Sequence, residues 1–234
     1  MLSAGACKGL LQALAEQFAA ETGADLDAQF GAVGAMRAEL ESGVPCDVVI
    51  LTAAMIAELA EEGVVLGESI VPLGSVPTGI AVRDGDDPPA VDSEAALKQA
   101  LLAASALYVP DTSRSTAGLH VAHMLRELGI AEAVSARLVE YPNGAAAMRA
   151  LADSDDAGAI GCTQVTEIKY TQGVRLVAPL PAAFALSTVY AMAVCREAPE
   201  PELARALSDL LTSRVAEDLR RDGGFELLND TEET

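Results

Sequence analysis

A chain of 234 residues with 51% hydrophobic residues can form one large domain or two smaller lobes, each with its own core. Its formal net charge of −20 repels nucleic acid and anionic lipid, and an aromatic content of 3% without Trp offers few rings for stacking. No stretch approaches the roughly 20 apolar residues of a membrane span. The composition therefore argues against nucleic acid partners and against membrane insertion.

The first part of the chain alternates helices and strands. Leu10, Leu14 and Phe18 recur every four positions, which predicts a helix over 9–22 that buries one stripe and ends at Gly23. The alternation continues with a strand at 30–32, a helix at 34–42, a buried strand at 47–51 and a helix at 53–62. This spacing implies crossover connections and a mostly parallel sheet.

A long extended segment with several Pro and Gly residues, 71–83, is predicted to carry the chain into a second lobe. There we expect helices at 93–103, 116–128, 143–152 and from Thr163, and strands at 106–109, 137–140 and 158–161. The segment 187–195 is the predicted return crossing, and helices at 201–212 and 213–222 precede an acidic end, 229–234, that we expect to be frayed. The predicted fold class is α/β with two lobes, 1–79 together with 187–234 and 80–186, each a mostly parallel sheet flanked by helices and joined by two hinge crossings.

The loops that follow the strands hold the candidate ligand-binding residues, because open parallel sheets bind ligands at the carboxyl ends of their strands. Gly5, Ala6 and Cys7 precede the first helix, and Val33 and Gly34 open the second. Small side chains let a ligand approach the backbone N–H groups of these helix N-termini, which attract anions. Small residues also suit plain tight turns, but two such loops in successive units favour an anion site.

A third loop brings hydroxyl groups and a guanidinium group to the start of another helix. Ser113, Ser115 and Thr116 can donate hydrogen bonds, while Arg114 can form a bidentate pair with a carboxylate. In the alternative interpretation Ser115 is a simple N-cap and Arg114 is a solvated surface residue. Two further polar candidates follow later strands, Asn143 and Gln164.

The sequence holds no catalytic or metal-binding signature, and we predict neither a cofactor nor a metal. His120 and His123 share a helix face but lack a third ligand at a suitable spacing, which favours packing or surface roles. Cys7 has no evident His partner that would make it a nucleophile. The four cysteines, Cys7, Cys46, Cys162 and Cys195, are scattered singly, so we expect core thiols and leave two disulfides in an exported protein as the alternative.

Four segments carry a family resemblance: Ser-Ala-Gly-Ala at 3–6, Phe-Gly-Ala-Val-Gly-Ala at 30–35, Ser-Gly-Val-Pro-Cys-Asp at 42–47 and Val-Ala-Pro-Leu-Pro at 177–181. They resemble the molybdate-type substrate-binding proteins of ABC transporters, which have the type II periplasmic binding fold. The resemblance implies hinge closure around a ligand and an ABC permease as partner. It also implies Ser in the first two loops and Tyr after the strand ending at Gly161. This chain has Ala6, Val33 or Gly34, and Cys162 there, so we expect an anion other than molybdate.

We therefore predict a non-enzymatic protein that binds a small anionic solute, an oxyanion or a carboxylate, in a cleft between two lobes. One alternative is a cofactor-free isomerase of an unsaturated carboxylate, with His120 or Lys8 as the base, because this divergent branch also resembles aconitate isomerase. Another is a cytoplasmic anion sensor. The chain as given shows no export signal, which predicts a cytoplasmic protein, or a periplasmic one if a leader has been removed.

Overall fold

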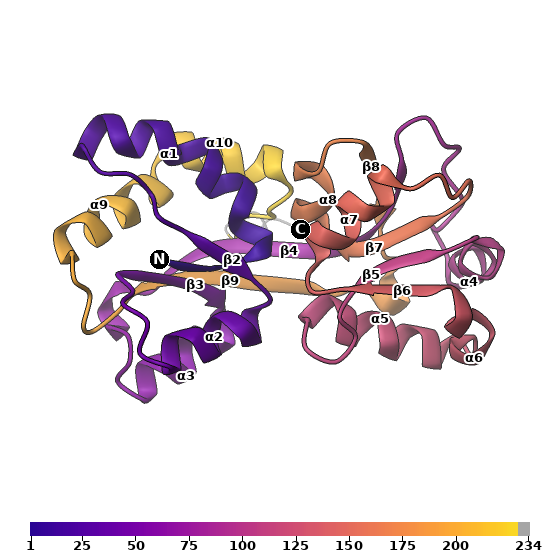
Figure 1. Cartoon of the computed structure of the whole chain (residues 1–234), viewed down its shortest axis with the longest axis horizontal. Coiled ribbons are helices and arrows are strands. Elements are labelled where there is room, and N and C mark those ends of the chain that lie inside the picture. Colours follow the sequence, from indigo (N-terminus) through magenta and orange to yellow (C-terminus); the bar gives the residue numbers. More distant parts are fainter. Residues whose placement is uncertain (229–234) are drawn as a thin grey trace. The chain divides into compact units, whose positions relative to one another are not determined.

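The computed structural model describes residues 1–228, so the expected fraying of 229–234 lies outside the described residues. The chain divides into two compact units: unit 1 is Met1–Val76 with Thr188–Thr234, and unit 2 is Pro77–Ser187. It leaves unit 1 within the long strand β4 (Val71–Arg83) and returns at the start of β9 (Ser187–Val194) (Figure 1). The predicted α/β class is confirmed.

The sheet of unit 1 has the strand order β2-β1-β3-β9. Its remaining strands are β1 (Leu2–Ala4), β2 (Gln29–Gly31) and β3 (Val48–Thr52). Strand β1 is parallel to both β2 and β3, whereas β9 is antiparallel to β3. No strand was predicted before the first helix, because Leu2–Ala4 is a fully buried strand too short to show a hydrophobic period.

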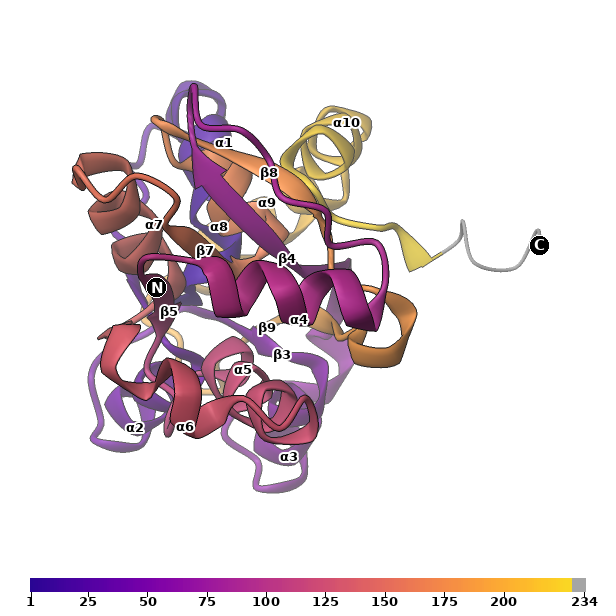
Figure 2. The same cartoon turned by 90° about the vertical axis from the view of Figure 1, so that its right-hand side faces the viewer.

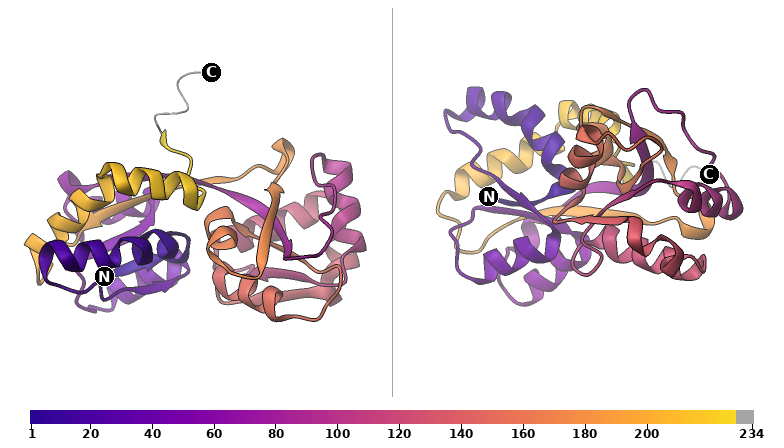
Figure 3. Two further views of the ribbon diagram at one scale, coloured as in Figure 1. Left: turned by 90° about the horizontal axis from the view of Figure 1, so that it is seen from above. Right: turned by 45° about the vertical axis from the view of Figure 1, so that its right-hand side comes forward.

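Helices cover both faces of this sheet. They are α1 (Lys8–Thr22), α2 (Val33–Glu41), α3 (Ala53–Glu61), α9 (Pro201–Thr212) and α10 (Arg214–Gly223). Helices α2 and α3 lie on one face, and α1, α9 and α10 lie on the other (Figure 1). Figure 3 shows α10 running alongside α1. The predicted end of the first helix is confirmed, because Gly23 adopts the left-handed conformation with φ of 74°.

The sheet of unit 2 has the strand order β4-β7-β5-β6, and β8 (Val174–Pro179) also pairs with β4. The other strands are β5 (Leu107–Pro110), β6 (Leu138–Tyr141) and β7 (Ile160–Gln164). Strand β5 is parallel to β6 and β7, and β4 is antiparallel to β7 and β8. The helix expected from Thr163 is present as α8 (Val165–Tyr170) but begins two residues later, because Thr163 and Gln164 continue β7 through pairing with β4.

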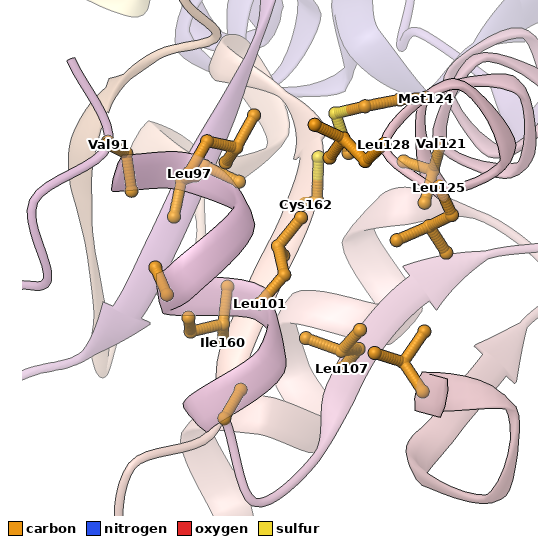
Figure 4. Packing of buried hydrophobic residues seen from close by; sticks show 14 of the residues in the cluster. Val91, Leu97, Leu101, Leu107, Val121, Met124, Leu125, Leu128, Ile160 and Cys162 are labelled. Carbon is orange, nitrogen blue, oxygen red and sulfur yellow. The ribbon is translucent and has the colours of Figure 1, made fainter. Parts of the chain in front are cut away.

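Two hydrophobic clusters hold unit 2 together, one on each face of its sheet. Helices α4 (Glu94–Ala103), α5 (Thr116–Glu127) and α6 (Ala131–Val134) pack over the first cluster, and α7 (Gly144–Asp153) and α8 (Val165–Tyr170) over the second (Figure 2). Figure 4 shows the first cluster, in which Leu101, Met124 and Cys162 lie among other apolar side chains. Burial on both faces explains why β5 and β7 read as continuous apolar strands.

Candidate functional site

The carboxyl ends of β1, β2 and β3 share one edge of unit 1, because the three strands are parallel. The 3-10 turn Gly5–Cys7 joins β1 to α1, and Ala32 joins β2 to α2. The N-cap residues of α1 and α2, Cys7 and Ala32, make no capping hydrogen bond with their side chains, whereas Thr52 caps α3 by accepting a hydrogen bond from the Met55 N–H group at 3.3 Å. The first-turn N–H groups of α1 and α2 are thus arranged at this edge without a side-chain cap.

The predicted residues of unit 1 contribute backbone rather than side chains. Ala6, Cys7 and Val33 are 5%, 0% and 6% exposed, so their side chains belong to the core. Gly5 is half-buried and Gly34 is exposed, and neither has a side chain. The structure brings all five residues to the same edge of the sheet, since they follow β1 and β2 directly.

A cation also lies at this edge. The Nζ atom of Lys8 stands 5.7 Å from the centroid of the Phe30 ring, which links the first two loops by a cation–π contact. The sequence suggested Lys8 as a base only. Its position next to two helix N-termini makes the edge electropositive, although the protein as a whole is strongly acidic.

The equivalent edge of unit 2 is organised by Asp111, which follows β5. Its Oδ1 atom accepts hydrogen bonds from the Ser113 hydroxyl at 2.6 Å, the Ser113 N–H group at 2.8 Å and the Arg114 N–H group at 3.1 Å. Hydrogen bonds from the Ser113 hydroxyl and backbone hold the pKa of Asp111 below its ordinary value. The Thr112 hydroxyl likewise donates to Glu140 at 2.7 Å. Two hydroxyls of this loop therefore donate to the chain's own carboxylates.

The rest of the loop fixes the start of α5. Ser115 is its N-cap, and its Oγ atom accepts a hydrogen bond from the Gly118 N–H group at 3.5 Å. A Cβ atom at Gly118 would overlap the carbonyl oxygen of Asp111, so this glycine allows the helix to approach the end of β5. Thr116 opens the helix and is half-buried, while Arg114 is exposed. The loop therefore presents one guanidinium group beside a helix N-terminus.

Asn143 and Gln164 lie at the ends of β6 and β7, at the same edge of the unit 2 sheet as the Asp111 loop. Asn143 caps α7, because its Oδ1 atom accepts a hydrogen bond from the Ala146 N–H group at 2.9 Å. Gln164 is 3% exposed and stands opposite Thr78 in β4. Asn143 therefore has a structural role, and Gln164 is buried, at the positions where the sequence suggested ligand contacts.

Sequence reasoning missed Glu167, a buried carboxylate in α8 that faces the start of α7. Its Oε2 atom accepts a hydrogen bond from the Thr163 hydroxyl at 2.6 Å. Burial raises the pKa of Glu167, and hydrogen bonds from Thr163 and from the backbone of Ala145, Gln164 and Gly144 partly offset this rise. The available signal was a carboxylate four residues after Thr163 in an otherwise buried segment. Glu167 occupies the N-terminus of α7, a typical anion position.

The family described as bacterial extracellular solute-binding protein matches residues 1–226. The chain belongs to this family. An aconitate isomerase from a Pseudomonas species is 29% identical over 234 residues, covering 96% of this chain and 86% of the relative. The periplasmic molybdate-binding protein of Azotobacter vinelandii has a TM-score of 0.77 at 19% identity over 97% of each chain. The sulfate-binding protein SubI from Mycobacterium tuberculosis H37Rv has a TM-score of 0.73 at 15% identity, covering 98% of this chain and 86% of that one.

These comparisons confirm the predicted family and the type II periplasmic binding fold. In this solute-binding protein, three positions for which the resemblance implied hydroxyl groups are apolar. Ala6 and Val33 are core residues, and Cys162 is 3% exposed within the first cluster of unit 2 (Figure 4). Burial raises the pKa of the Cys162 thiol to about 12, so it stays protonated and packs as a small apolar group.

Neither histidine of this solute-binding protein belongs to a cluster of metal-binding side chains among the described residues. The Nε2 atom of His120 donates a hydrogen bond to the Phe184 carbonyl oxygen at 2.8 Å, and His123 is exposed. Residues 1–228 contain no group of three or more His, Cys, Asp and Glu side chains suited to a metal ion. Within the same range, no helix combines the length and apolar character needed to cross a bilayer.

Proposed function

We propose that this solute-binding protein binds a small anion that carries carboxylate groups. The observation that carries the proposal is the pair of helix N-termini, of α1 and α2, that meet at one sheet edge without a side-chain cap. Such N–H groups bind anions through hydrogen bonds and through the positive end of the helix dipole. The cation of Lys8 above Phe30 adds to the attraction.

The donor groups of unit 2 favour a carboxylate over a tetrahedral oxyanion. Molybdate or sulfate would gain most from several short hydroxyl donors, but the hydroxyls of Thr112 and Ser113 donate to Glu140 and Asp111. Arg114 instead offers a planar fork, whose two parallel N–H groups match the two oxygens of a carboxylate. We propose Gly5, Ala6, Cys7, Val33 and Gly34 as the ligand-binding residues of unit 1, with backbone N–H groups as the donors. In unit 2 we propose Arg114, Ser115 and Thr116.

An ABC permease is the partner that we propose for this activity. The family is described as one of extracellular solute-binding proteins, and such a protein serves uptake only when it passes its ligand to a membrane component. Co-purification of the full-length protein with a permease encoded nearby, with and without the anion, would test the partnership.

A thermal-shift screen tests the ligand class. Molybdate, sulfate and phosphate form one arm, and di- and tricarboxylates form the other. A ligand at 100 times its dissociation constant stabilises the folded state by about 2.7 kcal/mol, which raises Tm by roughly 5 to 11 °C for a chain of this size. We expect such a shift from at least one carboxylate, followed by calorimetry for its affinity. Tight binding of molybdate with no response to any carboxylate would overturn the proposal.

A second candidate function is isomerisation of an unsaturated carboxylate, and the relative named aconitate isomerase favours it. The reaction needs one base that removes a proton from one carbon and returns it to another. His120 is a weak choice, since its Nε2 atom already donates to Phe184 and only Nδ1 can accept a proton. Lys8 stands at the proposed anion site and is the better one.

Proton NMR in deuterated water separates the two functions. A binding protein leaves the carbon-bound protons of cis- and trans-aconitate unchanged, whereas an isomerase replaces them with deuterium and interconverts the two compounds. Aconitate binding without exchange would support binding and exclude isomerisation. Catalytic exchange that persists in Lys8→Ala would exclude Lys8 as the base.

A further inference from the structure

Two buried cysteines meet in unit 1, although they are far apart in the sequence. Cys46 lies just before β3 and Cys195 just after β9, and these antiparallel strands pair Val48 with Val194. The Cys195 N–H group donates to the Asp47 carbonyl oxygen at 2.9 Å, which extends the ladder to the cysteines. The two thiols are hydrogen-bonded to each other, and the Cys46 thiol also donates to the Val48 carbonyl oxygen at 3.1 Å.

A pocket of about 500 Å³ borders both cysteines. Its wall also includes Pro45, Val64 and Arg196, all of unit 1. Cys46 and Cys195 are 4% and 5% exposed, so each sulfur is mostly covered but forms part of a surface that a small reagent can approach. Cys162, by contrast, lies inside the apolar core of unit 2 (Figure 4).

The two thiols differ in acidity: Cys46 is the more acidic and Cys195 the less acidic. A hydrogen bond with Cys195 lowers the pKa of Cys46, and the same interaction raises the pKa of Cys195. Cys46 is therefore the thiol of the pair that ionises more easily, and the thiolate is the form that attacks a disulfide.

We propose that Cys46 and Cys195 form a thiol–disulfide site that is oxidised by a small-molecule or protein disulfide. The Cys46 thiolate attacks one sulfur of the donor, a mixed disulfide forms, and the other donor sulfur leaves as a thiolate. Cys195 then loses its proton and attacks the Cys46 sulfur, which forms the internal disulfide and releases the second donor thiolate. Two protein thiols lose two electrons and two protons, and one donor disulfide becomes two thiols.

The Cys46–Cys195 disulfide would link two segments of unit 1 that are distant in the sequence. It joins the start of β3 to the end of β9, and the loop that it closes contains both crossings and all of unit 2, Pro77–Ser187. Closing so long a loop restricts the unfolded chain strongly and stabilises the folded one. The site also settles which cysteines pair: Cys7 and Cys162 remain thiols.

The test uses the full-length protein equilibrated in buffers of reduced and oxidised glutathione. After alkylation under unfolding conditions and proteolysis, mass spectrometry assigns each cysteine. We expect four alkylated thiols in reducing buffer, and in oxidising buffer two, with a cross-linked pair of peptides that contains Cys46 and Cys195. We also expect a rise in Tm of roughly 5 to 10 °C on oxidation. Four thiols after oxidation, or a bond that involves Cys7 or Cys162, would overturn the proposal.

Alkylation kinetics of the folded wild-type protein provide a readout that does not depend on the folding of any variant. At neutral pH we expect iodoacetamide to modify Cys46 at least ten times faster than Cys162, because burial raises the pKa of Cys162 to about 12. Equal rates would contradict a reactive Cys46. The matched variants are Cys195→Ala, in which oxidation should no longer raise Tm, and Cys162→Ala, in which the rise should persist; the opposite pattern would reject the site.

Discussion

The hydroxyl of Thr163 donates a 2.6 Å hydrogen bond to Glu167 within unit 2, and both side chains are buried. The carboxylate of Glu167 also accepts hydrogen bonds from the backbone of Ala145, Gln164 and Gly144. The N-terminus of α7 is therefore occupied by a carboxyl group that the protein supplies itself. This arrangement distinguishes α7 from α1 and α2, whose N-cap residues make no capping hydrogen bond with their side chains.

Gly144 is necessary for this arrangement, because a Cβ atom there would overlap Glu167 Oε2 and Thr163 Oγ1. Both atoms belong to buried side chains that are bonded to each other, so they have little room to move. We expect Gly144→Ala to lower the free energy of unfolding by about 1 to 3 kcal/mol in urea denaturation. The control is Gly223→Ala at the end of α10, where an added Cβ meets nothing within 4 Å. Equal effects of the two substitutions would contradict close packing at Gly144.

The pKa of Glu167 predicts how stability changes with pH. Burial raises its folded-state pKa above the ordinary value of 4.5, so the folded protein favours the protonated form. The contribution to stability is complete below about pH 4.5 and is lost as pH rises through the folded-state pKa. In the Glu167→Gln variant the side chain has no titrating proton. The free energy of unfolding of the wild type minus that of the variant should therefore decrease as pH rises, by at most about 1.4 kcal/mol per pH unit.

Urea unfolding of both proteins at a series of pH values from 4.5 to 8 measures this difference. The many other carboxylates titrate in both proteins and cancel, which isolates Glu167. Asp111→Asn is a control of opposite sign, because hydrogen bonds from Ser113 lower the pKa of Asp111. The stability of the wild type relative to Asp111→Asn should change only at acid pH, where it decreases as pH falls and Asp111 becomes protonated. If the stability of the wild type relative to Glu167→Gln increased as pH rises, the folded protein would favour the ionised form of Glu167, and the prediction would be wrong.

Most of the elements could be predicted because each carries its own local signal. Glycines that end helices, such as Gly23 and Gly129, have φ of 74° and 67°, and their places in the sequence mark the ends of α1 and α5. β1 and β8 could not be predicted in this way. β1 has only three residues, and β8 becomes a strand through pairing with β4, a contact between distant parts of the chain.

The loops that hold the candidate residues could be located from the sequence, but the contacts of their side chains could not. Strand–loop–helix alternation located the loops after β2 and β5, since it fixes which edge of a parallel sheet they occupy. The loop before α1 was found from its small residues, without β1. The sequence could not show that Ser113 donates its hydroxyl to Asp111, or that Glu167 faces the start of α7. Both depend on side-chain directions that only the folded backbone sets.

The last prediction concerns Arg114, the exposed guanidinium beside the start of α5. We expect Arg114→Ala to weaken binding of a carboxylate ligand by roughly ten- to a hundred-fold in calorimetry, since a charge-assisted hydrogen bond contributes about 1.5 to 3 kcal/mol. The free energy of unfolding should change by no more than about 0.5 kcal/mol, as is usual for an exposed loop side chain.

The matched control is Arg126→Ala, which removes the same charge from the last turn of the same helix. That residue lies at the opposite end of α5, so its loss should leave affinity within about two-fold and lower stability by a fraction of a kcal/mol through the helix dipole. Comparison of the two variants separates a direct contact from a general loss of positive charge, because only a direct contact depends on which end of α5 carries the arginine. Equal losses of affinity would mean that long-range attraction alone accounts for Arg114. Wild-type affinity in Arg114→Ala would leave the backbone N–H groups and the hydroxyls of Ser115 and Thr116 as the donors.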